Sequence, residues 1–297
     1  MRSKMKKLRA LLLFPPFLFA HPLLAQTKTK PADVVINQVN DRRTNGSFAQ
    51  LTISLELPGV KASEVAASRV LVSSAVDDSG KSLVDAGGRE PQLESSSRMG
   101  MTHDDGSSPP AHISVTLKNP DRKATKVKEV RGDIELYMPS KDPNSTAEIA
   151  KVLSLSGKPL AHKALAANSV EITIVGPAQL AAEKKRRGDV KRAEAKAAGL
   201  EGKELEEYVS SYLESVLKLD DDEVLVRIKD PNKRIQQIGY VTAAGETKQV
   251  STRDDEGFTR LSTWGEKPQP DWKLRVSMTT PKNLVRQPFA LTDVPLP

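Results

Sequence analysis

The chain has 297 residues, of which 45 are lysine or arginine and 38 are aspartate or glutamate, and it contains no cysteine. The absence of cysteine excludes disulfides, cysteine-bound zinc, iron–sulfur clusters and thiol nucleophiles. Hydrophobic residues make up 38% and charged residues 28% of the chain. This composition is typical of packed cores rather than of a wholly disordered chain, and the length indicates about two domains.

Residues 1–25 have the pattern of an export signal. Five basic side chains precede a short apolar run at residues 10–20, which contains Pro15 and Pro16 and is followed by small and apolar residues up to Ala25. A secretory signal peptide has this order, whereas a membrane-spanning helix needs about 20 apolar residues. We expect cleavage after Ala25, no transmembrane segment in the mature chain, and a periplasmic or secreted bacterial protein.

The net charge depends on this segment. The whole chain carries a formal charge of +7, but loss of the five basic residues leaves 40 basic against 38 acidic side chains. Nucleic-acid binding needs a retained basic surface. The composition therefore argues against a nucleic-acid partner.

The mature chain begins with residues 26–46, which are expected to form a flexible leader and a first strand. A period-two alternation of apolar and polar residues follows, as in residues 49–57, where Leu51, Ile53, Leu55 and Leu57 share one face. Such alternation predicts strands with one buried face, and these occur mainly in antiparallel sheets. The same pattern recurs at residues 111–117, 130–138, 170–175, 224–228 and 272–278. The polar segment 85–110 is predicted to be a long loop.

A helical insert is predicted at residues 177–221. The segment 183–196 holds seven basic and three acidic side chains, whereas the segment 201–223 holds two basic and nine acidic ones. Opposite charges on consecutive helices favour a hairpin over one long rod, although the sequence leaves both open. The second helix is amphipathic, with apolar residues at intervals of three and four: Leu205, Tyr208, Val209, Tyr212, Leu213, Val216 and Leu217.

The predicted fold is mainly β, with two immunoglobulin-like antiparallel β-sandwich domains and an intervening α-helical hairpin. The first sandwich is expected at residues 47–176, including an extra hairpin at 140–176, and the second at 222–297. An internal repeat supports this division, because residues 112–139 can be aligned with residues 273–297. In that alignment Val115 matches Val276, and Asp133-Ile134 matches Asp293-Val294.

Two strings carry a resemblance to a known group of proteins. Residues 75–83 (AVDDSGKSL) and 288–297 (PFALTDVPLP) resemble segments of uncharacterised exported bacterial proteins with immunoglobulin-like β-sandwich domains. The resemblance implies a fold and a compartment, and it brings no site residues with it.

Candidate chemistry is sparse. Met99, Met101 and His103 are the weak candidates for a metal site, because two thioethers and an imidazole suit copper(I). The acidic runs 220–223 and 254–256 lack the spacing of a calcium-binding EF-hand loop, and no G-x-S-x-G nucleophile motif is present. We therefore expect no cofactor and no catalytic residues.

Partner-binding candidates are Leu205, Tyr208 and Tyr212 on the second helix, and Trp264 in a proline-rich turn. The helical stripe is more typical of a core than of a docking surface, and Trp272 falls on the apolar side of a strand. The preferred hypothesis is a non-enzymatic interaction or scaffolding protein with another envelope protein as its partner. The alternatives are a carbohydrate-binding accessory module that uses Trp264, and a metal-binding or hydrolytic enzyme.

Overall fold

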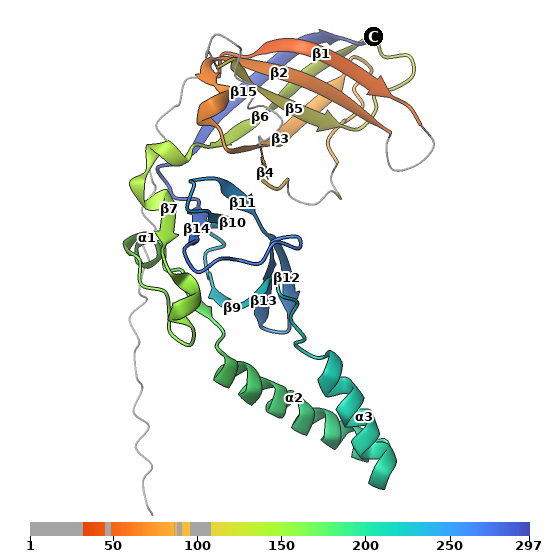
Figure 1. The fold of residues 1–297 in the computed structure, drawn as a ribbon. Helices are drawn as coiled ribbons and strands as arrows, with labels where there is room; N and C mark the ends of the chain where they lie inside the picture. Colours follow the sequence, from red (N-terminus) through yellow and green to blue (C-terminus); the bar gives the residue numbers. More distant parts are fainter. Residues whose placement is uncertain (1–31, 45–48, 86, 88–90, 96–107) are drawn as a thin grey trace, which may run out of the picture.

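The computed structural model describes residues 32–44, 49–85, 87, 91–95 and 108–297. The predicted signal peptide and the metal candidates Met99, Met101 and His103 lie outside these residues. The described part is mainly β and contains four antiparallel sheets, a few short helices and one long helical hairpin (Figure 1). The prediction of a mainly β, antiparallel fold is confirmed.

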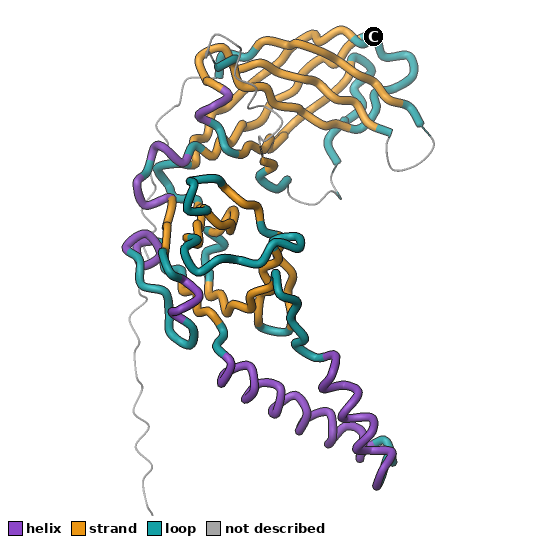
Figure 2. The backbone as a smooth tube through the Cα atoms, in the orientation of Figure 1, coloured by secondary structure: helices purple, strands orange, loops and turns teal. Residues whose placement is uncertain are grey.

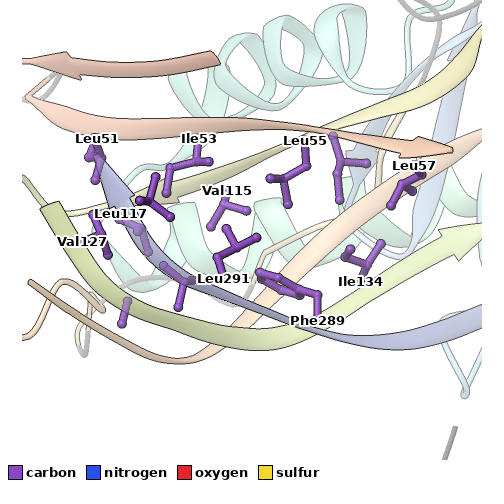
Figure 3. Close-up of a cluster of buried hydrophobic side chains, with 14 of the residues drawn as sticks. Leu51, Ile53, Leu55, Leu57, Val115, Leu117, Val127, Ile134, Phe289 and Leu291 are labelled. Atoms are coloured by element: carbon purple, nitrogen blue, oxygen red, sulfur yellow. The ribbon is translucent and has the colours of Figure 1, made fainter. Parts of the chain in front are cut away.

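The first pair of sheets encloses one hydrophobic core. A three-stranded sheet in the order β1-β2-β5 faces a four-stranded sheet in the order β15-β6-β3-β4. The apolar side chains of β2, which alternate in sequence, point toward Ile134 and Phe289 of the opposite sheet (Figure 3). The strands are β1 (Val35–Arg42), β2 (Gln50–Lys61), β3 (Ala67–Asp77), β4 (Glu94–Ser95), β5 (Pro110–Leu117), β6 (Lys126–Tyr137) and β15 (Leu284–Pro295).

The second pair of sheets encloses a separate core. One sheet has the order β11-β10-β14-β7 and the other the order β12-β13-β9-β8. Tyr240 and Trp272 pack in this core with ring centroids 5.9 Å apart, so the expected burial of Trp272 is confirmed. The strands are β7 (Thr146–Ile149), β8 (Glu171–Ile174), β9 (Glu223–Lys229), β10 (Ile235–Val241), β11 (Thr247–Gln249), β12 (Ser251–Asp255), β13 (Phe258–Ser262) and β14 (Lys273–Met278).

Two helices form the predicted insert. α2 (Pro177–Ala197) and α3 (Gly202–Ser215) follow β8 and precede β9, and they fold into a hairpin that projects from the β body (Figure 2). Gly188 lets the helices approach closely, because a Cβ atom there would lie 3.1 Å from Cδ2 of Leu213. The shorter helices are α1 (Lys163–Ala167), η1 (Ala62–Glu64), η2 (Pro139–Lys141), η3 (Pro143–Ser145) and η4 (Val152–Leu155).

The strand pairing differs from the expected division of the chain. β15 pairs with β6 from Leu284–Tyr137 to Pro295–Lys126, so the last strand completes the first core rather than the second. The expected hairpin at 140–176 does not form either, because β7 pairs with β14 and β8 pairs with β9. The second core is thus inserted between β6 and β15, and the helical hairpin is inserted within the second core.

This pairing also removes the basis for two separate repeats. In the alignment, β6 corresponds to β15 and β5 corresponds to β14. The structure pairs β6 with β15 in one sheet, whereas β5 and β14 belong to different cores. Alternation in the sequence indicates which face of a strand is buried, but it carries no information about the neighbouring strand.

The two connections between the cores are held together by buried polar groups. Thr280 Oγ1 donates a hydrogen bond to Asp142 Oδ2 at 2.7 Å, and the Met138 amide donates to the Asn283 carbonyl at 2.8 Å. Asn283 itself is fully buried and donates to the Met278 carbonyl at 2.9 Å. Because buried polar groups need partners, these bonds fix one path for both crossings.

Candidate functional site

The predicted partner-binding residues on α3 separate into a core position and exposed positions. Leu205 is only 4% exposed and packs with Ala195 and Val209 between the two helices, so it forms part of the hairpin core. Tyr208 is 44% exposed and Tyr212 is half-buried. The Lys191 Nζ atom lies 5.6 Å from the centre of each tyrosine ring, which covers one side of both rings with a cation.

The base of the hairpin is fixed to the second core by Arg187 of α2, whose side chain is 4% exposed. Its Nη1 atom donates to Asp255 Oδ1 at 3.2 Å, and its Nη2 atom donates to the carbonyl oxygens of Asp255 and Glu256 at 3.1 and 3.3 Å. Its Nε atom donates to Glu183 Oε1 at 3.0 Å. A buried guanidinium is tolerated because its donors are paired in this way.

The contacts of Asp255 extend this arrangement into the sheet. Asp255 also accepts from Arg260 Nη2 at 2.8 Å, and Arg260 Nη1 donates to Glu223 at 2.7 Å. Burial raises the pKa of Asp255, but the hydrogen bonds from Arg260 and Arg187 outweigh it and leave the pKa below its ordinary value. We call Arg187, Asp255, Arg260 and Glu223 the hairpin lock.

The aromatic ring of Phe258 lies close to two cations beside the lock. The guanidinium carbon of Arg187 is 5.8 Å from the centre of the Phe258 ring, and that of Arg227 is 5.0 Å from it. Phe258 is 5% exposed and belongs to a small apolar cluster with Leu217 and Leu225. Charge and apolar packing therefore hold the same end of the hairpin.

The basic run of α2 is largely neutralised within its own helix. Lys185 pairs with Asp189, and Lys191 pairs with Glu194. Arg192 spans the two helices and pairs with Glu206 of α3 at 2.8 Å. The expected attraction between oppositely charged helices is thus present at Arg192, while the ion pairs of Lys185, Arg186 and Lys191 stay within α2 and Arg187 reaches the sheet.

Glu183 is the acid that receives two of these basic side chains. The hydrogen bond from Arg186, together with that from Arg187, outweighs partial burial and lowers the pKa of Glu183 to about 2. The Glu183 carboxylate consequently stays ionised to a pH well below the ordinary pKa of a glutamate.

Trp264 occupies a turn after β13 and is 77% exposed. Its backbone has a φ of +62°, a left-handed conformation that is rare for bulky side chains. The carboxylate of Asp222 braces this turn: Oδ2 accepts from the Ser262 hydroxyl at 2.7 Å and from the Gly265 amide at 2.8 Å. The bond from Gly265, followed by that from Ser262, lowers the pKa of Asp222.

Further bonds complete the turn. The Asp222 carbonyl accepts from the Thr263 amide and hydroxyl at 3.3 and 3.2 Å. The Thr263 hydroxyl also contacts the Glu266 carbonyl. The side chain of Glu266 in turn pairs with Lys248 of β11 at 3.1 Å. The turn is thereby attached to the start of β9 and to a neighbouring sheet.

His112 and His162 are the histidines of the described residues. His162 caps α1 by accepting from the Ala164 amide at 3.1 Å, and His112 is half-buried on β5. Within the described ranges, no group of three or more histidine, aspartate or glutamate side chains is arranged to hold a metal ion.

Sequence reasoning missed Arg187, because a residue within a run of four basic side chains has the pattern of a solvent-exposed helix face. Its partner Asp255 is 68 positions away along the chain. The adjacent Gly188 was the available signal, since a glycine inside a helix often marks close packing.

No helix in the described part of the chain is both long and apolar enough to cross a membrane. Comparisons with protein-family models, with curated proteins and with solved structures each found no match to this chain.

Proposed function

We propose that this chain is a non-enzymatic interaction or scaffolding protein of the bacterial periplasm or exterior. In this proposal, two immunoglobulin-like sandwich domains form the body and the α2–α3 hairpin is the arm that binds another envelope protein. The nested chain path and the two separate cores support the division into two domains. Residues 1–25 supply the expected export signal.

The observation that carries this proposal is the fixed attachment of a projecting arm. Charged side chains such as Arg187 are rarely buried. A buried charge with all its partners in place can specify one orientation of the elements that it joins, here the hairpin and the sheet. A hairpin held in one orientation loses less conformational freedom when a partner binds.

The outer face of α3 offers a binding surface of mixed character. Glu204, Glu207, Tyr208 and Glu214 are exposed and lie on one side of the helix, at intervals of three, one and six residues. Tyrosine is enriched at protein interfaces, and acidic side chains around it favour a partner with a basic surface. We call these four residues the arm face.

Affinity capture from an envelope extract tests the proposal. The mature chain should retain a specific protein, and a variant with Tyr208→Ala and glutamine at the three acidic positions should lose it. The matched control changes Lys185 and Lys196 of α2 to glutamine, which alters exposed charges on the other helix. Retention that survives deletion of residues 178–218 would overturn the assignment of the arm as the binding element.

A further inference from the structure

The indole ring of Trp264 is displayed to solvent on the loop after β13. Among the described residues, Trp264 is the most exposed of the large hydrophobic side chains, at 77% against 50% for the next, Val35. The other exposed large hydrophobic side chains, which are Ile36, Leu155, Val190 and Tyr208, lie on β1, η4, α2 and α3. Among the described residues, Trp264 is thus the only exposed large hydrophobic side chain on this loop.

The loop is shaped to present this ring. A left-handed backbone is strained at a residue with a Cβ atom, and Trp264 adopts it with a φ of +62°. Asp222 stabilises the turn through the Ser262 hydroxyl and the Gly265 amide. Glycine would adopt this conformation without strain, so the turn itself does not explain why tryptophan occupies the position.

Polar residues neighbour Trp264 in the sequence and in the segment that binds its turn. Asp221 and Lys267 are exposed, and Asp221 lies next to the residue that binds the turn. Glu266 follows two residues after the ring and pairs with Lys248. A protein hot spot is usually enclosed by further apolar contacts that exclude water, and none of the other exposed large hydrophobic side chains among the described residues lies on this loop.

We propose that Trp264 is the stacking platform of a carbohydrate-binding site. The C–H face of a pyranose unit is about the size of one aromatic ring and needs no wider apolar surface. Its hydroxyl groups would donate hydrogen bonds to carboxylates such as that of Asp221. The ligand class that fits is an oligosaccharide of equatorially linked pyranose units, as found in glucans and in polymers of N-acetylglucosamine. This site is distinct from the arm face.

Fluorescence provides a direct assay, because the chain has two tryptophans and Trp272 is buried at 5% exposure. Acrylamide quenching should therefore report mainly on Trp264. The full mature chain is titrated with cellohexaose and, separately, with chitohexaose. At least one of the two should protect the fluorescence from acrylamide and shift the emission to shorter wavelength, and the two arms distinguish glucans from N-acetylglucosamine polymers.

Calorimetric titration of variants then assigns the binding to the ring. Trp264→Ala should weaken affinity at least about tenfold, since it removes one stacked ring, while Trp264→Phe should retain part of it. Val35→Ala, which alters another exposed apolar side chain, is the matched control and should bind as the unaltered chain does. Urea unfolding checks that Trp264→Ala is folded.

Two outcomes would overturn the inference. The first is that neither hexasaccharide binds at millimolar concentration. The second is that binding persists unchanged in Trp264→Ala. Loss of a captured envelope protein from Trp264→Ala, with no sugar binding by the unaltered chain, would also overturn it and would place Trp264 in a protein interface. The arm face is tested by its own variants, so failure here leaves that proposal standing.

Discussion

The hairpin lock and the Trp264 turn each hold a side chain in an environment that is unusual for its type. Two carboxylates that are adjacent in the sequence, Glu223 and Asp222, stabilise them. Glu223 accepts from Arg260 within the lock, whereas Asp222 accepts from Ser262 and Gly265 in the turn. The lock buries a charge, and the turn exposes a large ring. Asp222 and Glu223 are consecutive at the start of β9, so one end of this strand contributes a carboxylate to the lock and to the turn.

Arg187→Ala should have the largest effect. It leaves Asp255 and Glu183 each without one of their cationic partners in a largely buried setting, which we expect to lower the free energy of unfolding by about 3 kcal/mol. Urea unfolding measures this loss. Arg186→Ala removes the largely exposed partner of Glu183 and should lower the midpoint less, because solvent screens an exposed ion pair. Equal effects of the two substitutions would show that the lock does not depend on the buried guanidinium.

Asp222→Ala should loosen the turn without releasing the hairpin. The Gly265 amide and the Ser262 hydroxyl lose their shared acceptor, but both regain water, so the loss of stability should be smaller than for Arg187→Ala. Amide hydrogen exchange should accelerate at residues 262–266 and stay slow in α2. Asp221→Ala, at the exposed neighbour, is the control. Faster exchange in α2 would mean that the lock and the turn are not separable.

Trp264→Gly should raise stability, in contrast to the two preceding changes. The left-handed backbone at this position suits glycine, and relief of the strain should add about 1 kcal/mol to the free energy of unfolding. Thermal or urea unfolding of the two proteins gives the sign directly. A destabilised glycine variant would indicate that the ring makes packing contacts that compensate for its backbone.

Acid titration of Glu183, which pairs with Arg187 of the lock, should show the smallest effect. The pKa of Glu183 is about 2 in the folded chain, below its ordinary value of about 4.3. This carboxylate therefore contributes stability above the ordinary pKa, and that stability is lost as the pH falls toward 2. The urea midpoint of Glu183→Gln should depend less on pH across this window than that of the unaltered chain, and an identical dependence would contradict the pairing.

The sequence was sufficient to predict some of the local elements. Alternation located β2, where Leu51, Ile53, Leu55 and Leu57 are all buried, and the charge and apolar pattern located both long helices. It was insufficient for the pairing of β15 with β6, because strand alternation specifies a face and not a neighbour.

The candidate binding residues were predictable to a similar degree. The amphipathic pattern of α3 correctly favoured a core role for Leu205, and the strand phase correctly favoured burial of Trp272. Exposure of Trp264 was left open, since it depends on a turn whose brace, Asp222, is distant in sequence. The burial of Arg187 depends in the same way on Asp255, which comes from another element.

The return of the last strand to the first core has a consequence for how the protein acquires its structure. Phe289, Leu291 and Val294 of β15 are part of that core, yet they leave the ribosome after every residue of the second core. The second core can assemble from a continuous stretch of chain, whereas the first must wait with an incomplete sheet. Contacts between such distant segments slow folding and prolong the exposure of apolar strands. Newly made chains are therefore expected to be most prone to aggregation through β6, in the interval before β15 arrives.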